Sequence, residues 1–361
     1  MPNLCRLLAG GTPEDLAGID ADEAKLLVNA ARAEGVSPLL YQHLGLRLPE
    51  PWAHTLRQDA LRSEAVELLR QANDWQLLDA LAATGIDALL MKGAVLGCSV
   101  YGSPGQRPRT DTDLLIRETD VDGSLAVLGR LGYEVAAGDT GSTLHYQLFA
   151  SRKLPNGQAH GVDVHWRINN RLEFARLFDF DELRSRALPL SPFGPAALGL
   201  GLSDSLLLAC LHRVGHLNEG EPERLIWLYD IHLLVEHLDG AVEQEFITLM
   251  REKRLTGICD AGVSTAARCF GTRLSPQFAD ELKMNTADEP TRGLLGAGPL
   301  GTLWRQFLAQ PGWNHRWRFL RELTLPPEDY MRRKYPASVA PVAWLWLRRG
   351  LEGVQRRVGK G

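Results

Sequence analysis

Two aspartates separated by one residue, Asp111 and Asp113, most constrain how this chain can fold. They follow the basic stretch 107–110 and precede the apolar run 114–116. Alternate residues of a strand share a face, so the two carboxylates would lie about 6.5–7 Å apart along the backbone. Because unpaired carboxylates are costly to bury, this face is predicted to line a cleft rather than the core. A hard cation such as Mg²⁺, together with a phosphate ligand, suits such a pair.

Asp-x-Asp also occurs in turns and as solvated charge, so its surroundings decide the interpretation. Upstream, the apolar run 86–91 ends at Lys92 and Gly93, and residues 94–101 can form two turns of helix. A strand that turns into a helix at a glycine presents backbone N–H groups to an anion. Lys92 adds a point charge that suits phosphate, and glycine, lacking a Cβ, lets the phosphate approach closely.

A third carboxylate lies downstream on a predicted strand, 161–167. Alternation places Asp163 and His165 on one face of this strand and apolar residues on the other. A lone aspartate in such a strand is commonly a salt-bridged surface residue. Here it falls where a two-metal site needs a third ligand, or a base near the attacking hydroxyl. His165 is expected to line the cleft, and both a structural and a catalytic role stay open for it.

Other charged residues near these motifs are ambiguous. Arg107 and Arg109 are predicted either to pair with the neighbouring carboxylates or to contact a triphosphate. His212 and His216 stand at i and i+4, but the glutamate of the zinc-protease pattern is missing. For this pair and for Asp230 we favour a hydrogen-bonded role between helices, or a substrate contact, over a metal site.

Taken together, the order Lys-Gly, Arg-x-x-x-Asp-x-Asp-Leu-Leu, Leu-Gly-Tyr and Val-Asp-Val-His-Trp resembles a poorly characterised bacterial nucleotidyltransferase family of the DNA polymerase beta-like superfamily. The similarity covers most of residues 75–336. It implies an α+β fold with an α/β core, in which a polymerase-beta-like nucleotidyltransferase core with a short mixed sheet is flanked by helical N- and C-terminal regions. The corner at Lys92 has alanine where much of the superfamily has serine, as in the Lys-Gly branches that include toxin nucleotidyltransferases.

The resemblance further implies a Mg²⁺-dependent enzyme, with Mn²⁺ as a substitute, that moves NMP from an NTP to an acceptor hydroxyl. The favoured acceptor is a small molecule, sugar, peptide or protein. The alternatives are transfer to tRNA or other RNA, and a non-catalytic nucleotide-binding module, against which three acids in one cleft argue. Replacing Asp113 by alanine is expected to abolish transfer without a cost in stability. The implied metal ligands are Asp111, Asp113 and Asp163; these and Lys92 are the implied catalytic residues; and Lys92, Gly93, Arg107, Arg109 and His165 are the implied nucleotide contacts.

Composition agrees with a cytoplasmic enzyme. The 361 residues are 45% hydrophobic and 23% charged, which is ordinary for a globular protein. The five cysteines form no Cys-x-x-Cys pair and are odd in number, which favours a reducing compartment over a disulfide framework. Neither a secretory signal nor an apolar run of transmembrane length is expected from the sequence.

The net charge of −4 hides an asymmetry between the two ends of the chain. Residues 312–361 hold 11 basic and 4 acidic side chains, a balance of +7, so residues 1–311 carry −11. Four of the nine tryptophans, at 313, 317, 344 and 346, also lie in this end. A basic, aromatic end can contact nucleic acid or an anionic membrane. The alternative, favoured here, is a helical region that packs tryptophan inward.

Periodicity predicts three regions: a helical region over 1–75, a nucleotidyltransferase core over 76–190, and a helical region over 191–361. A proline-type helix start is expected at Thr12-Pro13, a glycine helix stop at Gly132, and a helix cap at Ser203. Strands are predicted at 86–92, 111–117, 144–150 and 161–167, and helices at 60–81, 94–101, 121–132, 203–216, 222–238, 241–254 and 258–270.

Overall fold

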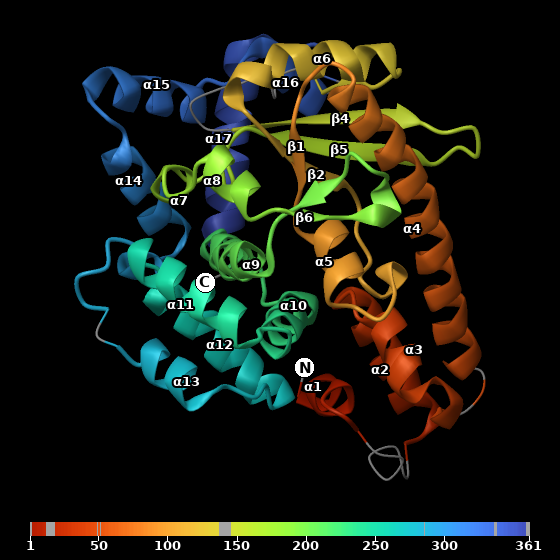
Figure 1. The fold of residues 1–361 in the computed structure, drawn as a ribbon. Helices are drawn as coiled ribbons and strands as arrows, with labels where there is room; N and C mark the ends of the chain where they lie inside the picture. Colours follow the sequence, from red (N-terminus) through yellow and green to blue (C-terminus); the bar gives the residue numbers. More distant parts are fainter. Residues whose placement is uncertain are drawn as a thin grey trace.

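The computed structural model describes residues 2–11, 19–48, 50, 52–136, 146–284, 286–335 and 338–358. It is an α+β protein in which helices surround one mixed sheet of seven strands, ordered β3-β4-β5-β2-β1-β7-β6 (Figure 1). The predicted fold class is thus confirmed. The strands are β1 (Ala88–Leu90), β2 (Thr112–Ile116), β3 (Glu134–Val135), β4 (Gln147–Lys153), β5 (Ala159–His165), β6 (Leu188–Pro189) and β7 (Leu198–Gly199).

Helices precede, interrupt and follow the sheet along the chain. Before it lie α1 (Pro2–Leu8), α2 (Ala21–Ala33), α3 (Ser37–Leu44) and α4 (Trp52–Ala82). Within it lie α5 (Gly93–Ser99), α6 (Val121–Arg130), α7 (Leu172–Ala175) and α8 (Phe180–Ser185). After it follow α9 (Leu202–Asn218), α10 (Leu225–Glu236), α11 (Gly240–Glu252), α12 (Thr256–Phe270), α13 (Pro276–Leu282), α14 (Pro299–Ala309), α15 (Trp313–Thr324), α16 (Glu328–Lys334) and α17 (Val342–Val358).

The middle of the sheet joins three of the predicted strands, 86–92, 111–117 and 161–167, as neighbours. β2 pairs antiparallel with β1 and parallel with β5. All residues of β1 and β2 are buried, which explains why both read as apolar runs. In the β2–β5 register, Asp113 stands directly opposite Asp163. The order of these strands therefore places both carboxylates on one face of the sheet.

Local signals at helix ends were correct in one case and wrong in another. Gly132 has φ +78, and the amide of Tyr133 donates to the carbonyl of Leu128 (3.0 Å), so α6 ends in the predicted glycine stop. Ser203 is not a cap, because α9 begins one residue earlier, after Gly201. The Ser203 hydroxyl instead donates to Glu245 (2.7 Å). The predicted start at Thr12-Pro13 lies outside the described residues.

Two apolar cores support the architecture. The larger one joins α1–α3 to α9–α13, and the smaller one lies between the sheet, α6 and the second half of α4. Figure 1 shows α4 passing along one side of the molecule from α2 and α3 to the sheet. It crosses the predicted boundary at residue 75, and β7 extends the sheet beyond residue 190. The division into three regions stays a prediction.

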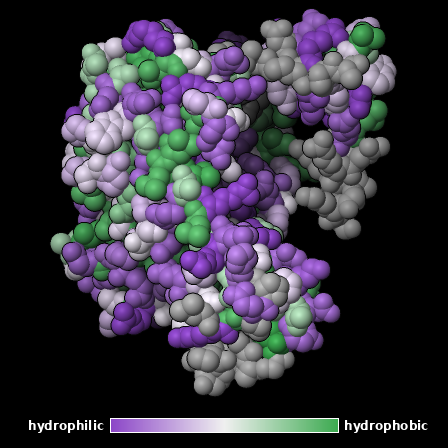
Figure 2. All heavy atoms as spheres, turned by 90° about the vertical axis from the view of Figure 1, so that its right-hand side faces the viewer, coloured by the Kyte–Doolittle hydropathy of each residue, from purple (hydrophilic) through white to green (hydrophobic). Residues whose placement is uncertain are grey.

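The C-terminal helices expose aromatic residues. Trp313, Trp317 and Trp344 are 68%, 67% and 52% exposed, whereas Trp346 is half-buried and donates to the carbonyl of Pro326. The favoured inward packing is therefore wrong for three of the four tryptophans. Elsewhere, the face that α4 crosses is mainly hydrophilic, with a band of hydrophobic side chains near its middle (Figure 2). In the described part of the chain, no helix is both long and apolar enough to span a bilayer.

Candidate active site

A cleft of about 950 Å³ lies between the sheet and helices α9 and α10. Its core side is formed by the β1–α5 corner, the loop before β2, and strands β2 and β5. Every site residue predicted from the sequence lines it: Lys92, Gly93, Arg107, Arg109, Asp111, Asp113, Asp163 and His165. Residues separated by more than 70 positions thus meet in one cavity.

Asp113 is the centre of the cleft's charged cluster. Its Oδ1 accepts from Lys92 Nζ at 2.6 Å and lies 3.0 Å from His165 Nε2. Burial alone would favour the neutral acid, but Lys92 and His165 outweigh it and hold the pKa of Asp113 well below its ordinary value of 3.8. Asp113 is therefore a buried, paired carboxylate rather than the unpaired, exposed one that the sequence suggested.

Asp163 and His165 join Asp113 in a compact group. One possible ligand atom from each of the three lies within 4.8 Å of the other two. Asp111 lies outside this group, immediately before β2, although it lines the same cleft. Burial, and then repulsion from Asp113, raise the pKa of Asp111. The two aspartates of the motif consequently have opposite electrostatic environments.

Lys92 occupies the corner between β1 and α5 in an unusual backbone conformation. Its φ is 51 and its ψ is −129, a region that side-chain-bearing residues rarely adopt. Burial opposes its charge, but Asp113 outweighs burial and raises the pKa of Lys92. The corner thus directs a charged ammonium group into the cleft.

Gly93 is closely packed against the protein's own loop before β2. A Cβ at this position would stand 3.2 Å from the Cβ of Arg109 and 3.6 Å from Nη1 of Arg107. The sequence suggested that this glycine makes room for a phosphate. In the structure, it is the loop before β2 that approaches Gly93 closely, through Arg107 and Arg109.

Arg107 pairs with a carboxylate that the sequence did not connect to it. Its Nε and Nη2 donate to the two oxygens of Asp230, each at 2.7 Å. Tyr101 donates its hydroxyl to the same carboxylate at 2.6 Å. The expected pairing with Asp111 or Asp113 is therefore corrected to a fork with Asp230 on α10, which also gives Asp230 the predicted hydrogen-bonded role between elements.

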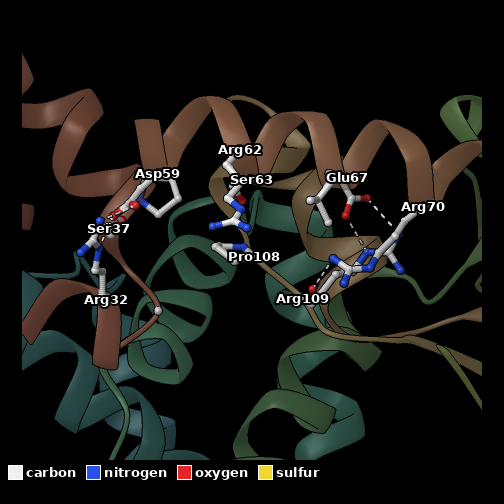
Figure 3. A pocket seen from close by; sticks show the side chains of 12 residues that line it. Arg32, Ser37, Asp59, Arg62, Ser63, Glu67, Arg70, Pro108 and Arg109 are labelled. Carbon is white, nitrogen blue, oxygen red and sulfur yellow. Dashed lines mark hydrogen bonds and ion pairs between the residues drawn. The ribbon is translucent and has the colours of Figure 1, made fainter. Parts of the chain in front are cut away.

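Arg109 differs most from its prediction. It lies beneath β2, where Nε and Nη2 donate to Glu67 (2.8 and 2.9 Å) and Nη2 also donates to Asp74 (2.8 Å). Nη1 donates to the Thr112 hydroxyl at 2.6 Å, and that hydroxyl donates to Asp74 at 2.7 Å. Figure 3 shows the fork between Arg109 and Glu67 from the side of α4, facing a separate small pocket. Its donors are engaged by protein, which corrects the expected triphosphate contact.

Sequence reasoning missed the acids that hold these arginines. Glu67 and Asp74 are one heptad apart on α4, so they share a helix face. Two acids at heptad spacing, on a face that also carries Leu77, Leu78 and Leu81 at the end of the helix, were a signal for a buried cation. His160 on β5 extends the network, with Nε2 2.9 Å from Asp74 and Nδ1 2.7 Å from the Tyr133 hydroxyl.

The two histidines of α9 line the opposite side of the cleft. Their Nε2 atoms are 3.0 Å apart, and Nδ1 of His216 lies 3.1 Å from Glu221. The ring of Trp227 on α10 stacks on His216 with a centroid distance of 4.7 Å. Burial lowers the pKa of His212 well below 6.5. These hydrogen bonds lie within α9 and between α9 and the segment that follows it, while the contact between helices is the stacking of Trp227 on His216. The hydrogen-bonded role between helices therefore stays a prediction.

The donor set of the cleft fits a hard divalent cation. Carboxylate oxygens of Asp113 and Asp163 are the ligands that Mg²⁺ and Mn²⁺ prefer. The Lys92 ammonium already contacts one oxygen of Asp113. A bound cation would therefore share Asp113 with Lys92 or replace it at that oxygen.

The fold and the cleft define a protein in which three acids and a lysine meet on one side of a mixed sheet. The chain belongs to a family described as uncharacterised nucleotidyltransferases, whose model matches residues 20–271. Among solved structures, it is similar to an antigenic nucleotidyltransferase-like protein from Paracoccidioides brasiliensis. That likeness has 16% identity and a TM-score of 0.38, and it covers 61% of this chain and 94% of the other. A comparison with curated proteins gives no match.

Proposed function

We propose that the protein transfers NMP from an NTP to an acceptor hydroxyl, with Mg²⁺ or Mn²⁺ as cofactor. The observation that carries this proposal is the register of β2 and β5, which sets Asp113 beside Asp163 with Lys92 2.6 Å from the former. Adjacent acids held next to a cation favour phosphate chemistry, because a binding module gains nothing from concentrating negative charge in a cleft. Family membership supports the same class of reaction.

Each residue has a distinct proposed role. Asp113 and Asp163, together with Asp111 at the edge of the cluster, hold the metal, which neutralises phosphate charge when bound. Asp163 also takes the proton of the acceptor hydroxyl, as that oxygen bonds to the α-phosphorus and pyrophosphate leaves. Lys92 moves from Asp113 to the phosphates and stabilises the negative charge on the departing pyrophosphate. Arg107 and Arg109 act at a distance, since they hold the loop that carries Asp111.

The favoured acceptor is a small molecule, sugar, peptide or protein, for which α9 and α10 form the wall. RNA is a second candidate because the basic C-terminal region reaches the cleft. Arg349 of α17 and Leu323 of α15 both line it. A positive side chain in the cleft wall suits a phosphate backbone.

Incubation with each α-labelled NTP, Mg²⁺ and either total tRNA or a metabolite and protein extract tests this proposal. Asp113→Asn and Asp163→Asn should each lower transfer about 100-fold or more, which corresponds to about 2.7 kcal/mol of transition-state stabilisation. Asp87→Asn is the matched control, because Asp87 is paired with Arg117 and Arg184 and does not line the cleft. Full transfer by Asp113→Asn would refute the proposal, and salt-sensitive labelling of tRNA would select RNA as the acceptor.

A further inference from the structure

Arg171 is a buried arginine on the cleft wall that no step of the proposed transfer uses. It follows β5 by six residues, precedes α7 and lines the cleft. Its side chain is only 4% exposed. The backbone amide of Arg171 donates to Asn169 Oδ1 at 2.8 Å, which fixes where the side chain leaves the main chain.

The guanidinium of Arg171 is incompletely satisfied by protein. Nη2 donates to the carbonyl of Gly215 on α9 at 2.8 Å and lies 3.5 Å from Glu219 Oε1. Nη1 is buried and has no hydrogen-bond partner among the described residues. Buried donors are rarely left without an acceptor, and because Arg171 lines the cleft, a ligand there can supply one. The two carboxylate oxygens of Glu173 are likewise buried without a hydrogen-bond partner among the described residues, so this neighbour does not satisfy the guanidinium by hydrogen bonding.

Its charge is also less compensated than that of the two other buried arginines of the cleft. Carboxylate forks raise the pKa of both Arg107 and Arg109 above the ordinary value. Burial dominates at Arg171 and lowers its pKa, in spite of Glu219 and Glu173 nearby. Glu219 is 62% exposed, so solvent screens its attraction. An anion bound in the cleft would supply negative charge to compensate the guanidinium of Arg171.

We propose that Arg171 binds a phosphate group of a ligand in this cleft, at a subsite separate from Lys92 and the carboxylate cluster. A planar guanidinium held on one side by Gly215 presents its remaining N–H groups in the geometry that phosphate oxygens accept. The phosphate is either the terminal phosphate of the NTP or one carried by the acceptor. The inference rests on the proposed function only in assuming that nucleotide and acceptor share this cleft.

Calorimetric titration of the full chain separates the two sources. With Mg²⁺ present, the probes are ATP, AMP, and inorganic phosphate added to protein saturated with a non-hydrolysable ATP analogue. If Arg171 holds the terminal phosphate, Arg171→Met should lower the affinity for ATP about tenfold and leave the affinity for AMP unchanged. If Arg171 holds an acceptor phosphate, Arg171→Met should leave the affinity for ATP unchanged and lower the affinity for inorganic phosphate about tenfold. Wild-type affinity of Arg171→Met for all three probes would overturn the inference.

Three further variants make the test specific. Arg176→Met removes the same charge from an exposed neighbour that does not line the cleft, and it should bind every probe as the wild type does. Glu219→Gln removes the competing carboxylate and should tighten the phosphate probe a few-fold. If Arg171→Met fails to fold, as judged by circular dichroism, Arg171→Lys and Glu219→Gln decide. Unaltered affinity in both would overturn the inference.

The failure of this inference and of the proposed function are distinguishable. Asp113→Asn probes the metal and the transfer, whereas inorganic phosphate can bind at Arg171 without either. Phosphate binding that depends on Arg171, in a protein without transfer activity, would retain the subsite and reject the enzyme. A wild-type protein that binds none of the probes would reject the subsite.

Discussion

At the scale of single residues, the two aspartates of one short motif have different tasks. Asp113 is buried and paired, and it compensates the charge of Lys92. Asp111 carries a raised pKa because burial and its neighbour Asp113 both oppose its charge. The two carboxylates of the motif therefore differ in how strongly the folded protein favours their charged forms. The expectation that Asp113 can be replaced without a cost in stability assumed an exposed, unpaired carboxylate. The structure shows a buried carboxylate paired with Lys92 and His165, so we predict that its removal is costly.

Asp113→Asn and Asp111→Asn should accordingly shift stability in opposite directions at pH 7. We expect Asp113→Asn to lower the free energy of unfolding by about 3 kcal/mol, and Asp111→Asn to raise it slightly. The folded pKa of Asp113 lies below 3.8, so its stabilising effect is present above that pH and is lost as pH falls through the folded pKa. Urea denaturation at pH 7 and at pH 3 measures both effects. Destabilisation by both variants at pH 7 would contradict this account.

The backbone of Lys92 offers a second test at this scale. A glycine tolerates positive φ, whereas an alanine does not. Lys92→Gly should therefore be more stable than Lys92→Ala by about 1 kcal/mol, although both lose the ion pair with Asp113. Chemical denaturation of the two variants gives the difference directly. Equal stabilities would mean that the corner relaxes when the lysine is lost.

At the scale of elements, the strand that carries Asp113 is fixed from behind by a helix that the sequence assigned to another region. Thr112 points away from the cleft and, with Arg109, bonds to the acids of α4. On the face opposite the cleft, a fully buried polar network at Thr112 thus lies beside the apolar core that contains Leu114 and Ile116. Such a network specifies the register of β2 more sharply than apolar packing would.

Arg109→Met should lower the free energy of unfolding by about 3–5 kcal/mol, because Glu67 and Asp74 would keep buried charge without their cation. Thr112→Val removes hydrogen bonds but no charge, and about 1–2 kcal/mol is expected for it. Thermal and urea unfolding measure both variants. A loss for Arg109→Met no larger than for Thr112→Val would show that the acids find other partners.

Sequence patterns predicted the elements better than their contacts. β2 and β5 were recognisable because alternation and apolar runs are local, and the shared face of Asp163 and His165 follows from period two alone. The partners of Arg107 and Arg109 were not recognisable. Asp230 lies 123 residues from Arg107, and Asp74 lies 35 residues from Arg109. Any of the chain's many carboxylates could have filled these positions, and only tertiary packing selects among them.

At the scale of the whole molecule, the carboxylate of Asp230 fastens the sheet part to the helical part across the cleft. It receives Arg107 from the loop before β2 and Tyr101 from the segment after α5. These contacts join residues from the two sides of the cavity that would have to move if the cleft opened. The width of the cleft is therefore set by the ion pair between Arg107 and Asp230 as well as by apolar contacts.

Asp230→Asn should lower the free energy of unfolding by about 3 kcal/mol, since Arg107 would remain buried without a counter-charge. Tyr101→Phe, which removes one neutral donor, should cost about 1 kcal/mol. Denaturation monitored by tryptophan fluorescence and by circular dichroism compares the variants. If Tyr101→Phe is as damaging as Asp230→Asn, the hydroxyl rather than the ion pair holds the two sides together.

The distance in sequence between Arg107 and Asp230 also sets an order in time for a ribosome-bound chain. At roughly 5–20 residues per second, the arginine is synthesised roughly 6–25 s before its partner. Once β2 has been synthesised, the nascent chain can pair it with β1, but it cannot complete the cleft until α10 has been made. The proposed transfer activity should consequently appear late in translation, and we expect fragments that stop before residue 230 to lack it.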